Sequence, residues 1–131
     1  MASATGSFEI ISAGEDPYHD VSGEPKLARA HGTQRFTGDI KGEGSVEWLM
    51  CYLPDGTARF VGHQRIAGSV AGRTGTFVVE AVGKHDGKQS EGTWMVIVGS
   101  GTGELSGLSG GGGFHALGGP HVSYTLEHDL G

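Results

Sequence analysis

Residues 57–98 read TARFVGHQRIAGSVAGRTGTFVVEAVGKHDGKQSEGTWMVIV. Along this stretch β-branched and aromatic residues alternate with polar ones, and a period of two is typical of strands that bury one face. Two turn pairs, Ala71-Gly72 and Asp86-Gly87, interrupt the alternation, and Asp-Gly is a strong hairpin signal because both residues tolerate positive φ. The stretch therefore predicts three consecutive antiparallel strands, over residues 57–70, 73–82 and 89–98.

The same pattern continues on both sides of this stretch. Further turn pairs at Gly42-Glu43 and Asp55-Gly56, together with apolar alternation near both ends of the chain, predict strands over residues 7–13, 29–41, 45–53 and 121–130. Residues 14–25 hold two prolines and several acids, so we expect a long loop there. Residues 99–113 hold eight glycines and predict a second loop, with one helical turn over 102–106 that Thr102 would cap.

The composition narrows the class of protein. A chain of 131 residues has room for one domain, over residues 1–131, and its 26 glycines argue against a helical bundle. A hydrophobic fraction of 36% with two Trp and five Phe argues against disorder. The net charge of −6 without a long basic run argues against nucleic-acid binding, and no apolar run reaches the ~20 residues that cross a bilayer. A single cysteine and the lack of a signal-peptide pattern lead us to expect a cytoplasmic protein with no membrane partner.

If each turn pair is a two-residue loop, the loops fix how the strands pair. Glu47 then lies opposite Gln64, Gln64 opposite Val79, and Val79 opposite Trp94. Residues paired across neighbouring strands share a face, so the loops define one face that we assign to the interior. Its predicted members are Gln34, Phe36, Ile40, Ser45, Glu47, Leu49, Cys51, Leu53, Phe60, Gln64, Ile66, Phe77, Val79, Ala81, Trp94, Val96 and Val98.

About eight antiparallel strands in sequence order bury one face most easily by closing on themselves, which also removes the open edges. The expected fold is all-β, an eight-stranded antiparallel meander barrel, and a two-sheet sandwich is the alternative. An eight-stranded barrel is either filled by side chains or holds one small ligand.

The predicted outer face carries a second apolar group. Because soluble monomers rarely leave such a patch in water, it predicts a homo-oligomer or cover from a terminal segment. The residues are Trp48, Met50, Tyr52, Val61, Val78, Met95 and Ile97, with Val46 beside them.

Glu47 is the candidate catalytic residue. On the predicted register its carboxyl faces an apolar interior, where burial would raise its pKa and make it a general acid or base near neutral pH. Gln64, opposite, would orient it or the substrate through its amide. The alternatives are a structural polar pair inside a filled barrel and a solvated position near a rim.

Aromatic and apolar side chains on the predicted inner face would line a cavity, with core packing as the alternative reading. The candidate ligand-binding residues are Gln34, Phe36, Leu49, Cys51, Phe60, Phe77, Val79, Trp94 and Tyr124. The seven histidines show no metal-binding spacing, and Gly99–Gly103 lacks the motifs of a phosphate-binding loop. We therefore expect neither a metal nor another cofactor.

Several motifs in order along the chain resemble one bacterial family, domain of unknown function 3224. They are residues 36–40 (FTGDI), 42–47 (GEGSVE), 60–62 (FVG), 72–77 (GRTGTF), 92–94 (GTW), 99–105 (GSGTGEL) and 107–108 (GL). The resemblance covers nearly the whole chain and implies an eight-stranded barrel similar to that of allene oxide cyclase, calycin-like and commonly oligomeric. The family pattern often has acids at positions 64 and 112, where this chain has Gln64 and Gly112.

Three functions follow as hypotheses. Allene oxide cyclase folds a reactive lipid epoxide without a cofactor, so the resemblance suggests a cofactor-free cyclase or isomerase acting on a hydrophobic metabolite, with Glu47 moving a proton. The second hypothesis is a carrier that binds a hydrophobic small molecule without chemistry. The third is a packed barrel whose role is association with further copies.

Overall fold

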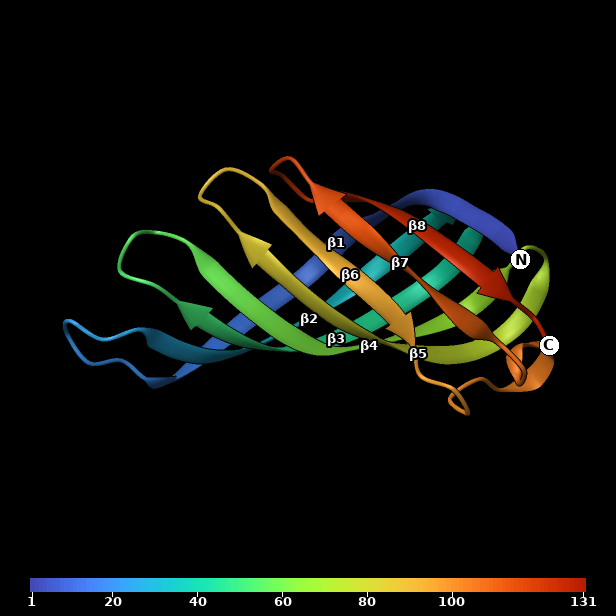
Figure 1. The fold of residues 1–131 in the computed structure, drawn as a ribbon, viewed down its shortest axis with the longest axis horizontal. Helices are drawn as coiled ribbons and strands as arrows, with labels where there is room; N and C mark the ends of the chain where they lie inside the picture. Colours follow the sequence, from blue (N-terminus) through green and yellow to red (C-terminus); the bar gives the residue numbers. More distant parts are fainter.

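The computed structural model describes residues 1–131 and is a closed barrel of eight antiparallel strands (Figure 1). The strands are paired in sequence order, and β8 pairs with β1 to close the ring. They are β1 (Ala2–His19), β2 (Lys26–Gly38), β3 (Ile40–Tyr52), β4 (Ala58–Val70), β5 (Arg73–His85), β6 (Ser90–Val96), β7 (Ser109–Ala116) and β8 (His121–Asp129), with the short 3-10 helix η1 (Gly103–Leu105) between β6 and β7. The predicted all-β meander barrel is confirmed, and closure excludes the sandwich.

The two ends of the barrel differ. At one end lie both chain termini and η1, while the hairpins that join β1 to β2, β3 to β4, β5 to β6 and β7 to β8 extend from the other end by unequal lengths (Figure 1). Leu105 and Leu108 are buried in the core cluster and close the end that carries η1. No helix is long and apolar enough to cross a membrane.

Six aromatic side chains of the interior lie opposite glycines. A ring needs room that a neighbouring side chain would occupy, and glycine supplies it because it has no Cβ. At Gly92 a Cβ would collide with the ring of Phe114. This pairing explains why a glycine-rich chain forms a packed barrel. The pairs are Tyr124–Gly6, Phe36–Gly42, Trp48–Gly62, Phe60–Gly83, Trp94–Gly112 and Phe114–Gly92.

Two predicted loops are partly strand. β1 continues to His19 through half of the segment expected as a loop, and the glycine run belongs to β7 rather than to a loop. The helical turn is present as η1, but Thr102 does not cap it through its side chain. The Thr102 hydroxyl instead accepts a hydrogen bond from the Thr76 amide, at 3.0 Å.

The hairpin lengths decide which predicted register is right. Ala71-Gly72 is a two-residue loop as expected, with φ of 50° and 83°, so the pairing of β4 with β5 is confirmed. Between β3 and β4 the loop has one residue more: the Leu53 amide donates to the Thr57 carbonyl at 2.8 Å, which leaves Pro54, Asp55 and Gly56 in the turn. A shift of one residue exchanges the two faces of a strand, so the predicted faces of β3 are wrong.

Two other turns also differ from prediction. Gly42 and Glu43 lie inside β3, because the chain reverses at Asp39 instead. The β5–β6 loop holds four residues, 86–89, so Val79 lies opposite Val96 and not opposite Trp94. That shift is two residues, which keeps Val96 and Trp94 inside the barrel. Val98 lies beyond the end of β6 and is exposed, contrary to prediction.

Candidate functional site

Glu47 lies on the outer face of the barrel, opposite His63, and is exposed. The prediction of a buried carboxylate facing Gln64 is therefore wrong, because the three-residue turn after β3 reverses the direction of every side chain in that strand. Gln64 does point inward and is fully buried, with Val46 and Val79 as its register partners. The proposed pair of an acid and an amide does not form.

The same reversal moves the neighbouring side chains of β3. Leu49 is exposed on the outside, and Cys51, a free thiol, is half-buried there, so neither lines the interior as predicted. Trp48, Met50 and Tyr52, which were expected on the outer face, belong to the inner face instead. The apolar surface expected from these three residues is therefore absent from the outside.

Seven other predicted site residues point into the barrel. Five of them are buried in its packed half: Phe36, Phe77, Val79, Trp94 and Tyr124. The remaining two, Gln34 and Phe60, lie at the opposite, hollow end.

The packed half is organised around Trp94 and Tyr124. The ring centroid of Trp94 lies 5.7 Å from that of Tyr124 and 6.2 Å from those of Phe36 and Phe114. The Tyr124 hydroxyl donates to the Thr37 carbonyl at 2.7 Å and accepts from the Ile40 amide at 2.9 Å. Burial raises the pKa of Tyr124, so the hydroxyl keeps its proton and holds β8 to the turn between β2 and β3. This half has a structural role.

A cavity of about 380 Å³ opens at the other end of the barrel. Phe8 and Ile10 of β1, Trp48 and Met50 of β3, Phe60 of β4 and Phe114 of β7 form its apolar walls. Trp48 and Phe60 meet edge to face, with ring centroids 4.8 Å apart. We call this space the mouth cavity. Lys88 of the β5–β6 loop and Gly118 and Gly119 of the β7–β8 loop also line it.

Gln34 is the polar group inside the mouth cavity. Its side chain is 4% exposed, and its Oε1 has no hydrogen-bond partner. A buried polar atom without a partner is costly, and in native proteins such atoms usually bind water or a ligand. An amide also presents an acceptor and donors on one group, so Gln34 can pair with a hydroxyl, an amine or a carbonyl.

The rim of the cavity carries two basic side chains, His85 and Lys88. His85 Nδ1 lies 2.8 Å from the Ser90 hydroxyl, and Lys88 extends from the same hairpin. No carboxylate lines the cavity.

Tyr52 lies farther along the inner face. Burial, a hydrogen bond to Glu15 and the negative charge of Glu15 together raise the pKa of Tyr52 to about 12, with burial as the largest cause. The Tyr52 hydroxyl is therefore neutral across the ordinary pH range.

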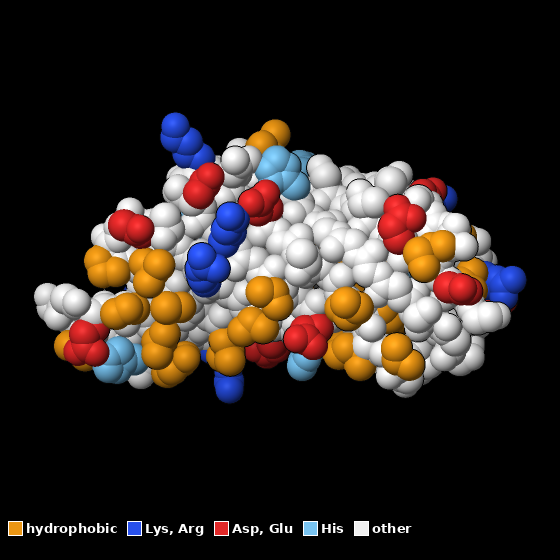
Figure 2. Space-filling view, in the orientation of Figure 1, with side chains coloured by type: hydrophobic (Ala, Val, Ile, Leu, Met, Phe, Trp, Pro, Cys, Tyr) orange, Lys and Arg blue, Asp and Glu red, His pale blue; other side chains and the backbone are white.

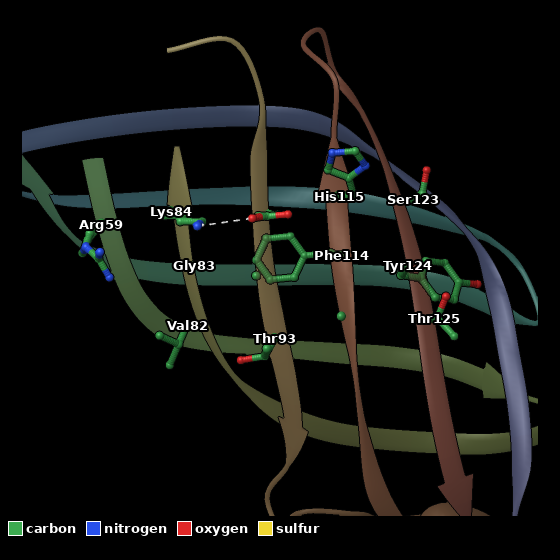
Figure 3. A pocket seen from close by; sticks show the side chains of 13 residues that line it. Arg59, Val82, Gly83, Lys84, Thr93, Phe114, His115, Ser123, Tyr124 and Thr125 are labelled. Atoms are coloured by element: carbon green, nitrogen blue, oxygen red, sulfur yellow. Dashed lines mark ion pairs between the residues drawn. The ribbon is translucent and has the colours of Figure 1, made fainter. Parts of the chain in front are cut away.

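A second depression, of about 590 Å³, lies on the outer face across β4 to β8 (Figure 3). Its side chains are mainly polar, and Lys84 Nζ lies 3.5 Å from a Glu91 carboxylate oxygen within it. His115 Nε2 is held by Gln89 Oε1 at 2.7 Å. The groove is open to solvent and has few apolar walls, so it encloses a ligand less than the mouth cavity does. No group of three or more His, Cys, Asp or Glu side chains is placed to hold a metal ion.

The mouth residues Phe8, Ile10, Trp48, Met50 and Phe114 were missing from the predicted site. A signal for the β3 members was present in the sequence. Val46, Trp48, Met50 and Tyr52 are all apolar or aromatic, whereas the alternate residues of the same strand include Ser45 and Glu47. The more apolar set of alternating residues is the one that faces a core.

Comparison with known proteins agrees with this architecture. The family model described as "Protein of unknown function (DUF3224)" matches residues 4–128. A crystal structure of a protein with unknown function from the same family, from Shewanella oneidensis, is 24% identical, with a TM-score of 0.77 over 98% of this chain and 97% of that one. No curated protein matches the chain. On the extent of the family match, the chain belongs to the DUF3224 family.

Proposed function

We propose that this protein binds a hydrophobic small molecule in the mouth cavity. The observation that carries the proposal is an apolar cavity with one buried amide, Gln34, whose oxygen has no partner. Ligand sites have this composition, with mostly apolar walls and a few polar groups that fix orientation. The cavity volume of about 380 Å³ lies within the range of small-molecule sites, roughly 300–1,000 Å³.

The aromatic walls supply the affinity. Trp48, Phe60 and Phe114 present ring faces and edges to the cavity. Removing apolar surface from water contributes roughly 25 cal/mol per Å², so a ligand that covers these rings gains most of its binding free energy there. A hydroxyl or amide group on the ligand would satisfy Gln34 and fix the orientation of the ligand.

A cofactor-free cyclase or isomerase is the catalytic form of the same proposal, and it requires a group that moves a proton inside the cavity. Glu47 is on the outside and cannot supply it. Among the lining residues, His85 is the histidine, the residue type that most often moves protons in enzymes, and its Nδ1 lies within hydrogen-bond distance of the Ser90 hydroxyl. Binding without chemistry needs no such group, so we favour it. The single thiol, Cys51, suits a reducing compartment such as the cytoplasm.

The test is titration with anilinonaphthalene sulfonate, a dye whose fluorescence rises in apolar sites. Wild-type protein should bind one dye per barrel. Ala30→Leu adds volume inside the cavity without removing a core side chain, and it should weaken binding at least about tenfold, the ratio that corresponds to 1.4 kcal/mol. Ala67→Leu adds the same volume on the outer face of β4 and should leave binding unchanged.

Ala116→Leu provides a second filling variant from β7 if Ala30→Leu does not fold, as judged by circular dichroism. The proposal is overturned if wild-type protein does not bind the dye, or if folded filling variants bind it as tightly as wild type.

A further inference from the structure

The outer face of the central strands carries a row of three aliphatic side chains. Leu49, Val61 and Val82 are register partners on β3, β4 and β5, so they lie side by side. They are 51%, 41% and 51% exposed. Met95 of β6 is 62% exposed and lies next to Glu80 across the β5–β6 pair, beside the end of the row. A continuous apolar row on a sheet face is the kind of surface that a partner covers.

Charged residues of opposite sign border the row. On one side of the aliphatic row, two residues along each strand, lie the register partners Glu47, His63 and Glu80. On the other side, at the same spacing, lie Cys51, Arg59 and Lys84. We call these the acidic row and the basic row. Figure 2 shows orange side chains along the lower middle of this face, with blue ones to their upper left and red ones to their right.

We propose that a second copy of this chain covers the aliphatic row. Two sheets that pack face to face as a symmetric dimer are related by a two-fold axis lying between them. If the axis runs along the aliphatic row, Leu49, Val61 and Val82 pack on their own copies. The acidic row of each subunit then faces the basic row of the other, and within these rows Glu80 and Lys84 of the partner subunit are the pair that joins opposite charges. A two-fold axis along the strands would place acid against acid, so the charge pattern selects the first arrangement.

The face also has the shape to receive a partner. A shallow hollow of about 650 Å³ lies over Gly62, bordered by Leu49, Val61, His63 and Glu80. Gly62 and its partner Trp48 both face the interior, so neither places a side chain in this outer hollow. In the proposed dimer this hollow accepts aliphatic side chains of the partner. Arg29 is the β2 register partner of Leu49, so it ends the aliphatic row on that side and limits the apolar contact to β3, β4 and β5.

The test is the oligomeric state, measured by sedimentation velocity and light scattering at micromolar concentration. Wild-type protein should be a dimer. Val61→Glu places a charge in the centre of the row and should raise the dimer dissociation constant at least about tenfold. Thr125→Glu places the same charge on the outer face of β8, far from the row in strand order, and should leave the dimer intact.

A charge-reversal cycle tests the orientation. On the proposed axis Glu80 faces Lys84 of the partner subunit. Both reversals are made in a Glu91→Gln background, because Glu91 lies 3.5 Å from Lys84 Nζ within the subunit and would repel a new carboxylate there. In that background Glu80→Lys and Lys84→Glu alone each create like-charge contacts and should weaken the dimer about tenfold, whereas the double variant should restore it to within about threefold. A wild-type monomer, a dimer that Val61→Glu leaves unchanged, or a double variant weaker than either single one would overturn the proposal.

Discussion

Trp94 is the direct cross-strand partner of Gly112, and its indole is the side chain around which the packed half of the barrel is arranged. Its ring centroid lies within 6.2 Å of those of Phe8, Phe36 and Phe114, and 5.7 Å from that of Tyr124. Trp94, Phe36, Phe114 and Tyr124 each lie opposite a glycine of a neighbouring strand, whereas Phe8 lies opposite Phe36 and Val122. Side chains therefore fill the packed half, and the open space lies at the mouth.

Gly112 should tolerate no side chain. A Cβ there would collide with the backbone oxygen of Thr125, and backbone moves less easily than a side chain. We expect Gly112→Ala to lower the free energy of unfolding by about 3 kcal/mol, the upper part of the range for overpacking, in urea denaturation. Gly111→Ala, whose Cβ would lie 3.1 Å from the Trp94 carbonyl oxygen, is the matched control and should cost clearly less. Equal losses would contradict this account of the glycine run.

The Tyr124 hydroxyl should contribute to stability. Tyr124→Phe leaves the buried Ile40 amide and the Thr37 carbonyl without their partner, so we expect a loss of about 1–3 kcal/mol in the free energy of unfolding. Ser123→Ala, the exposed neighbour on the outer face, should change it by less than about 0.5 kcal/mol. A Tyr124→Phe variant as stable as wild type would show that the tether is dispensable.

Glu47 should be unimportant for the cavity. Because the carboxylate lies outside the barrel, Glu47→Gln should leave dye affinity unchanged, while Gln34→Leu alters the affinity of ligands that carry a hydroxyl or amide. Isothermal titration with paired polar and apolar ligands measures both effects. Loss of affinity in Glu47→Gln at unchanged stability would place the carboxylate back at the site.

Gln64 should be replaceable by a hydrocarbon. It is fully buried, and neither its Oε1 nor its Nε2 has a hydrogen-bond partner. Gln64→Leu removes two unpaired polar atoms at similar volume, so we expect unfolding to require about 1–3 kcal/mol more. Thermal and urea unfolding measure the change. Strong destabilisation would indicate that a bound water or ligand pairs with the amide.

The contact between η1 and β5 should weaken in acid. The Thr74 amide and hydroxyl both donate to Glu104 Oε1 at 3.1 Å, and these bonds hold the pKa of Glu104 below its usual range. A lowered folded-state pKa stabilises the fold above the ordinary carboxyl value, and this contribution is lost as the pH falls through the lowered pKa. The protection factor of the Thr74 amide, which corrects for the pH dependence of intrinsic exchange, should therefore fall in acid, and Glu104→Gln should remove that part of the pH dependence. An unchanged profile in the variant would contradict this assignment.

The fold could be predicted from the sequence because alternation of polar and apolar residues and turn pairs are both local features of the chain. Ala71-Gly72 sets the β4–β5 register by itself, and the strands around it follow. The glycine-rich strand β7 could not be predicted, because a run of glycines shows no alternation of polar and apolar residues. Its pairing depends on Trp94 and Leu126 of the two flanking strands, which are distant in sequence.

The site was harder to predict than the fold because it depends on one residue of one turn. Pro54-Asp55-Gly56 and Asp55-Gly56 are both good turn sequences, and the choice between them decides whether Glu47 or Trp48 faces inward. The Asp55 carboxylate accepts from both the amide and the hydroxyl of Thr57, at 2.9 Å and 2.6 Å, within the observed turn. Residue spacing alone does not predict such a side-chain contact.

The most direct test of ligand binding uses the three methionines of the chain as built-in probes. Met50 lines the mouth cavity, Met95 lies on the outer face, and Met1 is exposed at the terminus. In methyl-labelled protein titrated with anilinonaphthalene sulfonate, the Met50 methyl resonance, assigned with Met50→Leu, should move and saturate while the other two stay in place. A stationary Met50 resonance, or equal shifts at all three methyl groups, would contradict binding in the mouth of the barrel.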